Sequence, residues 1–222
     1  MSVGPRSRRE RPAKPALTRQ GIIDAALAIL STEGLGKVTM RRIATELDTG
    51  HASLYVYVRD AEDLHAQILD ALLAPVAAAE PPAGTWRDRI KALLFGYRDV
   101  LHARPEIARM ALSTQPSGPH FTALVEAILT QLIAGGAGDR AAAWGVDMLL
   151  LGQTAIAVEH STPKPVTHAT ADLDAIAATI ATADPSRTPT IARLGAELVS
   201  GTPAERASWA VDVTLDGILA AS

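Results

Sequence analysis

The sequence predicts an all-α fold in which a small three-helix N-terminal domain precedes a larger helical domain. Apolar residues make up 48% of the 222 residues, and aromatic residues only 4%. Most glycines and prolines fall between apolar stretches, within which apolar residues recur three and four positions apart, as on one face of an α-helix. The chain contains no Cys, so helix packing must hold the fold without disulfides or a Cys-based zinc site.

The N-terminal region begins with residues 1–17, which are rich in Arg and Pro and are predicted to form a flexible basic arm. Thr18 is a good N-cap for the first helix, which Gly34 and Gly36 end. The apolar residues of this helix share one face: Ile22, Ala26, Ile29 and Leu30.

Two short helices joined by a tight turn are predicted next. Thr39 begins the first of them, whose apolar stripe is Met40, Ile43, Ala44 and Leu47. Asp48, Thr49 and Gly50 form the turn. The following helix runs from about His51 to Tyr57, with Leu54 and Val58 on its buried side. Its exposed side is expected to carry His51, Ala52, Ser53, Tyr55 and Tyr57.

A linking helix over residues 61–74 is predicted to follow, with Asp60 and Asp63 resembling a capping box in which Asp replaces the usual Glu. Pro75, Pro81 and Pro82 close this helix. We therefore expect one domain over residues 18–60 and a second over residues 61–222, which includes the linking helix.

The larger domain is predicted to contain helices over residues 85–101, 105–112, 119–134, 139–160, 172–183, 190–199 and 203–220, with a loop over 161–170. No apolar stretch reaches the roughly 18 residues that a membrane span needs. The basic N-terminus is not followed by the hydrophobic run of a secretory signal. We therefore expect a cytoplasmic protein that does not enter a membrane.

Charge is distributed unevenly along the chain. Up to Arg59 there are 10 Lys and Arg residues against 5 Asp and Glu, a formal charge of +5, whereas the remainder has 11 against 19, a formal charge of −8. The basic part is a candidate for binding a polyanion, and the acidic part would be repelled by DNA. The alternative is that the arm charges only keep a disordered tail soluble.

The two short helices and their turn have the pattern of a helix-turn-helix. Their apolar faces must meet, and the helix before them completes a minimal core, which leaves the last helix protruding. Its small and hydrogen-bonding side chains suit a helix in the DNA major groove, and nearby basic residues add affinity by releasing counterions. Spacing alone leaves a plain helical bundle as an equal alternative.

The residues Thr39-Met40-Arg41-Arg42-Ile43-Ala44-Thr45-Glu46-Leu47 and Ala52-Ser53-Leu54-Tyr55-Val56-Tyr57-Val58 resemble the DNA-binding segment of the TetR family of repressors. The resemblance is strong over residues 18–73 and only architectural afterwards. It implies that Thr39 caps a helix and meets a phosphate, that Arg41 or Arg42 contacts the DNA backbone, and that His51, Ala52 and Ser53 face bases. Tyr55 and Tyr57 would touch phosphates or sugars, with packing and a solvated hydroxyl as the alternative.

Two departures from the family pattern bear on this interface. The usual Gly-Val-Ser-like turn is replaced by Asp48-Thr49-Gly50, so Thr49 or Gly50 caps the recognition helix. A Lys that often opens the next helix is replaced by Ala61, which removes a phosphate contact that we expect Arg59 to restore.

The resemblance also implies a homodimeric, ligand-binding second domain. The last two long helices would pair with those of a second subunit, placing two recognition helices about 34 to 36 Å apart on a palindromic operator. Binding of a small-molecule effector would then release the DNA. Bulky or polar residues on the helices around the expected pocket are its candidate lining, with a core or surface role as the alternative: Phe95, Arg98, His102, Met110, Phe121, Gln131, Trp144, Met148 and Gln153.

Two other classes of function remain open from the sequence. One is a helical enzyme that uses His102 or His120 as a base, although the chain has no Gly-rich phosphate loop and no nucleophile elbow. The other is an interaction module whose basic arm meets an acidic protein. No metal site is expected, because the histidines lack the spacing of metal ligands. No catalytic residue or cofactor is expected either.

Overall fold

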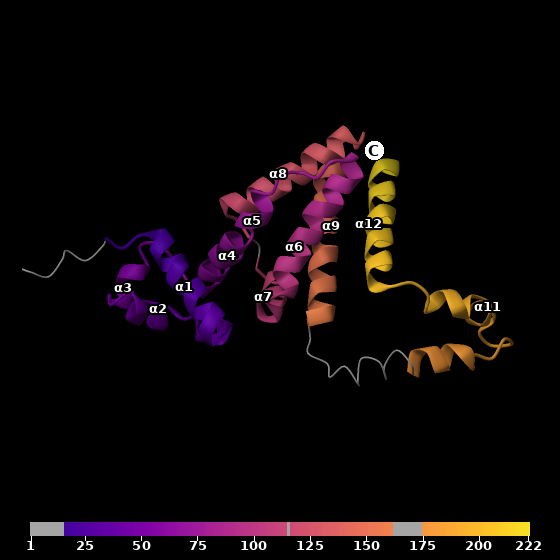
Figure 1. Ribbon diagram of the computed structural model, residues 1–222, viewed down its shortest axis with the longest axis horizontal. Helices are drawn as coiled ribbons and strands as arrows, with labels where there is room; N and C mark the ends of the chain where they lie inside the picture. Colours follow the sequence, from indigo (N-terminus) through magenta and orange to yellow (C-terminus); the bar gives the residue numbers. More distant parts are fainter. Residues whose placement is uncertain (1–15, 115, 162–174) are drawn as a thin grey trace, which may run out of the picture. The chain divides into compact units, whose positions relative to one another are not determined.

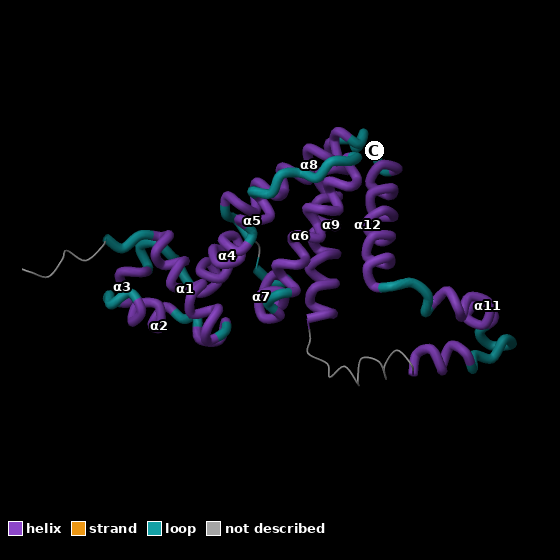
Figure 2. Tube along the Cα trace, viewed as in Figure 1, coloured by secondary structure: helices purple, strands orange, loops and turns teal. Residues whose placement is uncertain are grey.

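The computed structural model describes residues 16–114, 116–161 and 175–222. Within these residues every regular element is helical, which confirms the all-α prediction (Figures 1 and 2). Contacts divide the chain into two compact units, the first ending at Ile68 and the second beginning at Leu69. The arm up to residue 15 and most of the expected loop after Ser161 lie outside the described residues.

The first unit contains four α-helices and a short 3-10 helix, the fourth α-helix continuing into the second unit: α1 (Arg19–Glu33), η1 (Leu35–Lys37), α2 (Met40–Glu46), α3 (His51–Leu54) and α4 (Ala61–Leu72). Thr18 caps α1 by accepting the N–H of Gly21 at 3.0 Å, and Thr39 caps α2 by accepting that of Arg42 at 3.1 Å. Gly34 ends α1 at a φ of 83°, a conformation that glycine adopts without steric cost. Both N-caps therefore lie where the sequence predicts them.

One small apolar core holds these helices together. Ile22 from α1, Ile43 from α2 and Leu54 from α3 are all fully buried, as are Val58 and Leu64. Truncating one such side chain to Ala removes about 2–5 kcal/mol of stability in typical cores. This core fixes the orientation of α3, which is too short to be stable alone.

The recognition helix is shorter than the sequence suggests, and the prediction that it continues to Tyr57 is wrong. α3 ends at Leu54, after which the chain turns. The N–H groups of Tyr57 and Val58 both donate to the carbonyl oxygen of Leu54, at 2.9 and 3.0 Å. These two hydrogen bonds close a turn after α3, and α4 begins shortly afterwards.

The predicted capping box before α4 forms only in part. Asp60 Oδ1 accepts the N–H of Asp63 at 2.8 Å, as expected. Asp63 Oδ2, however, accepts the N–H of Arg59 at 2.8 Å, one residue before the usual partner. The shorter Asp side chain still satisfies a free N–H group at the start of the helix.

The second unit begins with the end of α4 and adds seven labelled helices: α5 (Ala74–Ala77), α6 (Trp86–His102), α7 (Pro105–Ala111), α8 (Pro119–Ala134), α9 (Asp139–Ser161), α11 (Pro189–Leu198) and α12 (Pro203–Ala220). Residues 175–181 are also helical. α6 and α9 pack along each other, and α7, α8 and α12 pack against α9 (Figure 1).

Polar contacts join the helices of this unit across its apolar core. The Tyr97 hydroxyl and Thr154 Oγ1 lie 2.8 Å apart between α6 and α9, and burial raises the pKa of Tyr97. Lys91 Nζ on α6 lies 2.7 Å from Asp212 Oδ2 on α12. Gly145 permits a close approach of α9 and α12, because a Cβ there would lie 2.6 Å from Ile218 Cδ1.

The apolar stretch of α9 is longer than the sequence analysis allowed, although the helix itself has nearly the predicted bounds. The stretch from Asp139 to Glu159 is long and apolar enough to cross a membrane, so the expectation that no stretch passes this test is wrong. The helix packs against α6, α7, α8 and α12, and so many neighbours require apolar residues on several sides. Its composition is therefore that of a core helix.

Candidate nucleic-acid interface and effector site

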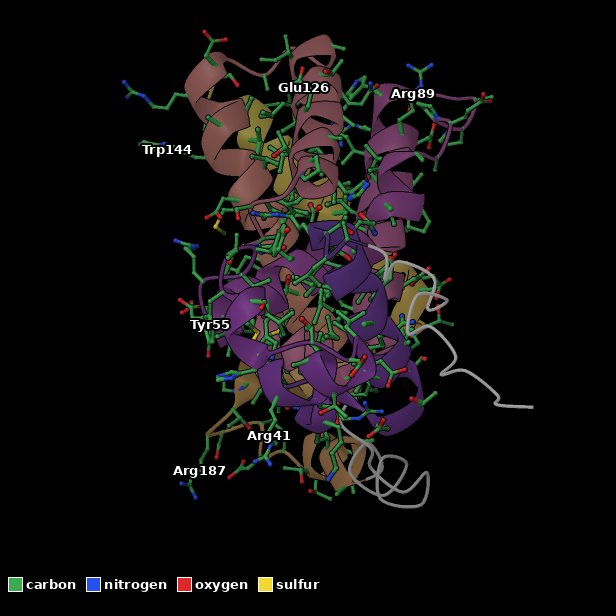
Figure 3. The ribbon with its side chains drawn as sticks, turned by 90° about the vertical axis from the view of Figure 1, so that its left-hand side faces the viewer. Arg41, Tyr55, Arg89, Glu126, Trp144 and Arg187 are labelled. Carbon is green, nitrogen blue, oxygen red and sulfur yellow. The ribbon has the colours of Figure 1, made fainter. Side chains whose placement is uncertain are left out.

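The residues expected to face bases lie on the free side of α3. His51, Ala52 and Ser53 are exposed, whereas Leu54 is fully buried. Tyr55 is 49% exposed, and its ring meets that of His51 edge to face with centroids 5.7 Å apart. Figure 3 shows the Tyr55 side chain at the surface of the first unit. The buried Leu54 thus anchors α3 to the core, and the three residues before it face the solvent.

The two arginines of α2 have different environments. Arg42 donates to Glu33 Oε1 through Nε at 3.2 Å and Nη2 at 2.7 Å, and to Glu46 Oε2 through Nη1 at 2.8 Å. These hydrogen bonds raise the pKa of Arg42 and lower that of Glu33. Arg41 is exposed and forms no ion pair with any residue that the structure describes (Figure 3). Of the two candidates, Arg41 has the charge available for a phosphate.

Tyr57 does not lie on the exposed side, contrary to the sequence-based expectation. It is half-buried, and its hydroxyl donates to the backbone carbonyl oxygen of Leu17 at 2.7 Å. Its neighbour Val56 is 79% exposed instead. Helical periodicity did not predict that Val56 is exposed and Tyr57 half-buried, because α3 ends before either residue.

The remaining candidates border the recognition helix. Gly50 is the N-cap of α3 and provides no side-chain hydrogen bond. Thr49 is half-buried, and its N–H donates to the Ala44 carbonyl oxygen at 2.8 Å. Arg59 has a largely exposed side chain, with its guanidinium 3.7 Å from Asp63 Oδ1.

Two of the expected pocket residues line a groove in the second unit. Arg98 and His102 of α6 border a space of about 250 Å³. The guanidinium of Arg98 lies 4.5 Å from the centre of the Phe95 ring, within range of a cation–π interaction. The other lining residues come from α6, α9 and the start of α12: Asp99, Ile156, Ala157, Pro203, Ala204 and Ala207.

Two candidate glutamines carry buried polar atoms without partners. Gln153 of α9 is only 3% exposed, and its Oε1 has no hydrogen-bond partner. Gln131 of α8 has a buried Oε1 in the same condition. Each unsatisfied acceptor costs roughly 1–3 kcal/mol, so a ligand that donates a hydrogen bond would recover part of this cost. Met110 and Phe121 are half-buried on α7 and α8.

Trp144 and Met148 do not point into the body, so their expected place in the pocket lining is wrong. They are 70% and 60% exposed on the outer face of α9, where Figure 3 shows Trp144 pointing away from the helices. Leu151 continues this face, and Trp209 and Val213 are similarly exposed on α12. Because α9 carries apolar residues on its exposed side as well as on its buried side, its periodicity did not distinguish the two faces.

A polar cluster in the second unit was missed by the sequence analysis. The buried Asp70 accepts the N–H of Phe121 at 2.8 Å and lies 3.0 Å from His120 Nδ1, at the start of α8. A Cβ at Gly118 would lie 2.1 Å from Asp70 Cγ. An acidic residue among the apolar residues of the linking helix was the available signal. His120 is thus bound to a helix-capping carboxylate.

Comparisons with protein-family models cover most of the chain. Residues 22–68 match the model for bacterial regulatory proteins of the tetR family. Residues 78–221 match the model for the tetracyclin repressor-like C-terminal domain.

Several regulators among the solved structures and the curated sequences are similar to this chain. The Streptomyces transcription regulator SCO7704 is 43% identical, with a TM-score of 0.73 over 93% of this chain and 96% of its own. ActR of Streptomyces coelicolor in complex with actinorhodin is 31% identical, with a TM-score of 0.78 over 94% and 98%. The repressor DrrR1 of Streptomyces coeruleorubidus is 33% identical over 136 residues, 60% of this chain and 49% of its own. The chain spans about half the length of the curated relatives it matches.

Proposed function

Because this chain belongs to the tetR family of bacterial regulatory proteins, we propose that it is a cytoplasmic repressor that binds a palindromic operator as a homodimer and is released by a small molecule. Regulators of this family are DNA-binding transcription factors and not enzymes. The observation that carries the proposal is the presentation of His51, Ala52 and Ser53 to solvent above the buried Leu54.

Selection of duplexes from a random pool by the purified full-length chain tests the DNA-binding part of this proposal. We expect recovery of an inverted repeat whose half-sites lie about one helical turn apart or a multiple of it. Ser53→Ala or His51→Ala should change which bases are preferred, because these side chains face the groove. Recovery of no preferred duplex would contradict the proposal.

The homodimer is supported by the exposed apolar face of α9 and α12, made up of Trp144, Met148, Leu151, Trp209 and Val213. These two helices pack against each other, so their exposed residues are well placed to form one surface. Contiguous apolar patches of this kind mark interaction sites in soluble proteins. Pairing with the same face of a second copy gives a closed four-helix arrangement.

The dimer is tested by Trp144→Glu in combination with Trp209→Glu, with the molar mass measured by light scattering. We expect the variant to be monomeric and to lose affinity for the inverted repeat, because a charge must then be buried at the interface. Glu126→Lys, at an exposed position of α8, is the matched control and should remain dimeric (Figure 3). A wild-type chain that is monomeric at operator-binding concentrations would contradict the proposal.

We propose that the effector site lies within the second unit. ActR, which is 31% identical, was solved with actinorhodin, and this chain offers the buried unpartnered acceptor of Gln153 together with the groove beside Arg98 and His102. We propose a largely apolar ligand that donates at least one hydrogen bond inside the body. Actinorhodin is the first probe: its binding should raise the melting temperature of the wild-type chain more than that of Gln153→Leu.

Release requires that the ligand bind one state of the protein better than another. We propose that the liganded body holds α4 so that the two recognition helices no longer match the operator spacing. A coupling of about 1–3 kcal/mol changes operator affinity by roughly 5- to 150-fold. A ligand that saturates the protein and leaves operator affinity unchanged would contradict this mechanism.

A further inference from the structure

The first turn of α8 takes its capping group from another helix. Gly118, the N-cap of α8, makes no side-chain hydrogen bond to the helix. Asp70, in the last turn of α4, instead accepts the N–H of Phe121 through Oδ1 at 2.8 Å. Phe121 is the third residue of α8, and the N–H at that position is one that an N-cap side chain commonly satisfies. The cap of α8 therefore comes from a residue 51 positions earlier in the chain.

A local cap and this long-range cap exclude each other. A Cβ added at Gly118 would overlap the carboxylate of Asp70, so a Ser, Thr or Asp at this position would displace it. A local cap of that kind would stabilise the start of α8 wherever α4 lay. With Gly118 as the N-cap, this N–H is capped only while Asp70 is in place. The first turn of α8 is thus linked to the position of the end of α4.

The environment of Asp70 favours this one arrangement strongly. The residue is only 6% exposed, and its neighbours Leu69 and Leu73 are fully buried. Its Oδ2 lies 3.0 Å from His120 Nδ1, and the N-terminus of α8 carries a partial positive charge that stabilises a carboxylate. A buried carboxylate that loses such partners is strongly unfavourable. The end of α4 therefore cannot slide freely along α8.

The position of α4 bears on operator binding, because α4 is one helix that begins in the first unit and ends in the second. We infer that Asp70 is a positioning residue for operator binding: by capping α8 it fixes the direction of α4, and with it the separation of the two recognition helices in the dimer. The inference rests on the proposed function and identifies a contact that sets the operator spacing. The alternative is that Asp70 only stabilises the second unit.

A distance measurement on the full-length dimer tests the inference directly. The chain contains no Cys, so Ser31→Cys, at an exposed position of α1, carries a single spin label in each subunit. Helix shifts of about 1–2 Å are typical of switching proteins, so two subunits give about 2–4 Å between the labels. We expect Asp70→Ala to shift or broaden the label distance by this amount. Asp70→Asn keeps an oxygen that accepts the Phe121 N–H, and should retain the wild-type distance.

Operator spacing gives a second readout, in the same variants without the label. Fluorescence anisotropy compares the inverted repeat that the wild type selects with a duplex that has one base pair inserted between the half-sites, a displacement of about 3.4 Å. In Asp70→Ala the ratio of the two affinities should fall by at least about fivefold, the lower end of typical couplings between sites. A loss of folded protein would lower both affinities equally and leave this ratio unchanged.

Two further variants separate positioning from stability. Gly118→Ala displaces the carboxylate without changing Asp70 and should alter the distance and the ratio in the same way, which provides the test if Asp70→Ala does not fold. Thr154→Val is the matched control, because it removes another buried polar contact of the second unit, the one with Tyr97. It should lower the melting temperature and leave both the distance and the ratio unchanged.

The outcomes separate this inference from the proposed function. An unchanged label distance and affinity ratio in the folded variants of Asp70 and Gly118 overturn the inference, and so does an equal change in Thr154→Val. The absence of any distance between labels in the wild type would instead overturn the proposed homodimer. Failure of the wild type to select a duplex would overturn the repressor function itself.

Discussion

The different environments of Arg41 and Arg42 give a quantitative prediction about DNA affinity. Arg41 is exposed and forms no ion pair within the described part of the chain, whereas the Arg42 guanidinium lies within 2.8 Å of two carboxylates. If Arg41 neutralises one phosphate in each half-site, Arg41→Gln removes two per dimer. The slope of log affinity against log salt then becomes shallower by about 1.8, which corresponds to roughly twelvefold over a fourfold change in salt.

The matched control must remove Arg42 without changing the net charge. Arg42→Gln combined with Glu33→Gln does so, because it deletes both partners of one ion pair. Fluorescence anisotropy with the selected duplex, at about 50 to 200 mM salt, measures the slope for each variant. The double variant should keep the wild-type slope. A slope as shallow as that of Arg41→Gln would show that Arg42 contacts phosphate and would refute the argument from its ion pairs.

Three further predictions concern the fold. Leu54→Ala should lower the free energy of unfolding by about 2–5 kcal/mol and abolish DNA binding, and an unchanged chemical denaturation curve would contradict the role of Leu54 as the anchor of α3. Gly118→Ala should cost about 1–3 kcal/mol through its clash with Asp70, whereas Gly36→Ala, with open space around its Cβ, should be nearly neutral in the same assay. Hydrogen bonds from the side chain and backbone of Thr85 lower the pKa of Asp88. The stabilising effect of the Asp88 carboxylate is therefore complete above its ordinary pKa of 3.8 and is lost as the pH falls through the lowered pKa. The melting temperature of Asp88→Asn should depend less on pH in this range than that of the wild type, and parallel pH profiles would contradict this prediction.

The sequence predicted those features that depend on neighbouring residues. Thr18 and Thr39 were identified as N-caps because a cap needs only its own helix, two or three positions ahead. The burial of Leu54 and Val58 followed from their spacing. The exposed positions of His51, Ala52 and Ser53 were predicted in the same way, and their contacts with DNA remain predictions.

Features that depend on distant residues were not predicted. The environment of Tyr57 is set by Leu17, 40 residues away, and that of Arg42 by Glu33 on another helix. Asp70 acts at the start of α8, about 50 residues further along the chain. Spacing along one helix carries no information about such partners, so it identified these side chains as polar without indicating what they bind.

The large apolar residues on the exposed side of α9 have one explanation that accounts for both the composition of the helix and their exposure. A helix that packs only against its own domain needs an apolar stripe and can keep its outer side polar. α9 instead keeps Trp144, Met148 and Leu151 on the side that its own neighbours leave open, and Trp209 does the same on α12. In the homodimer that we propose, a second copy of the chain supplies the missing neighbour, with the same face opposite itself. We therefore interpret the high apolar content of α9, which makes it resemble a membrane span, as that of a helix that packs against its own domain on one side and against a second copy on the other.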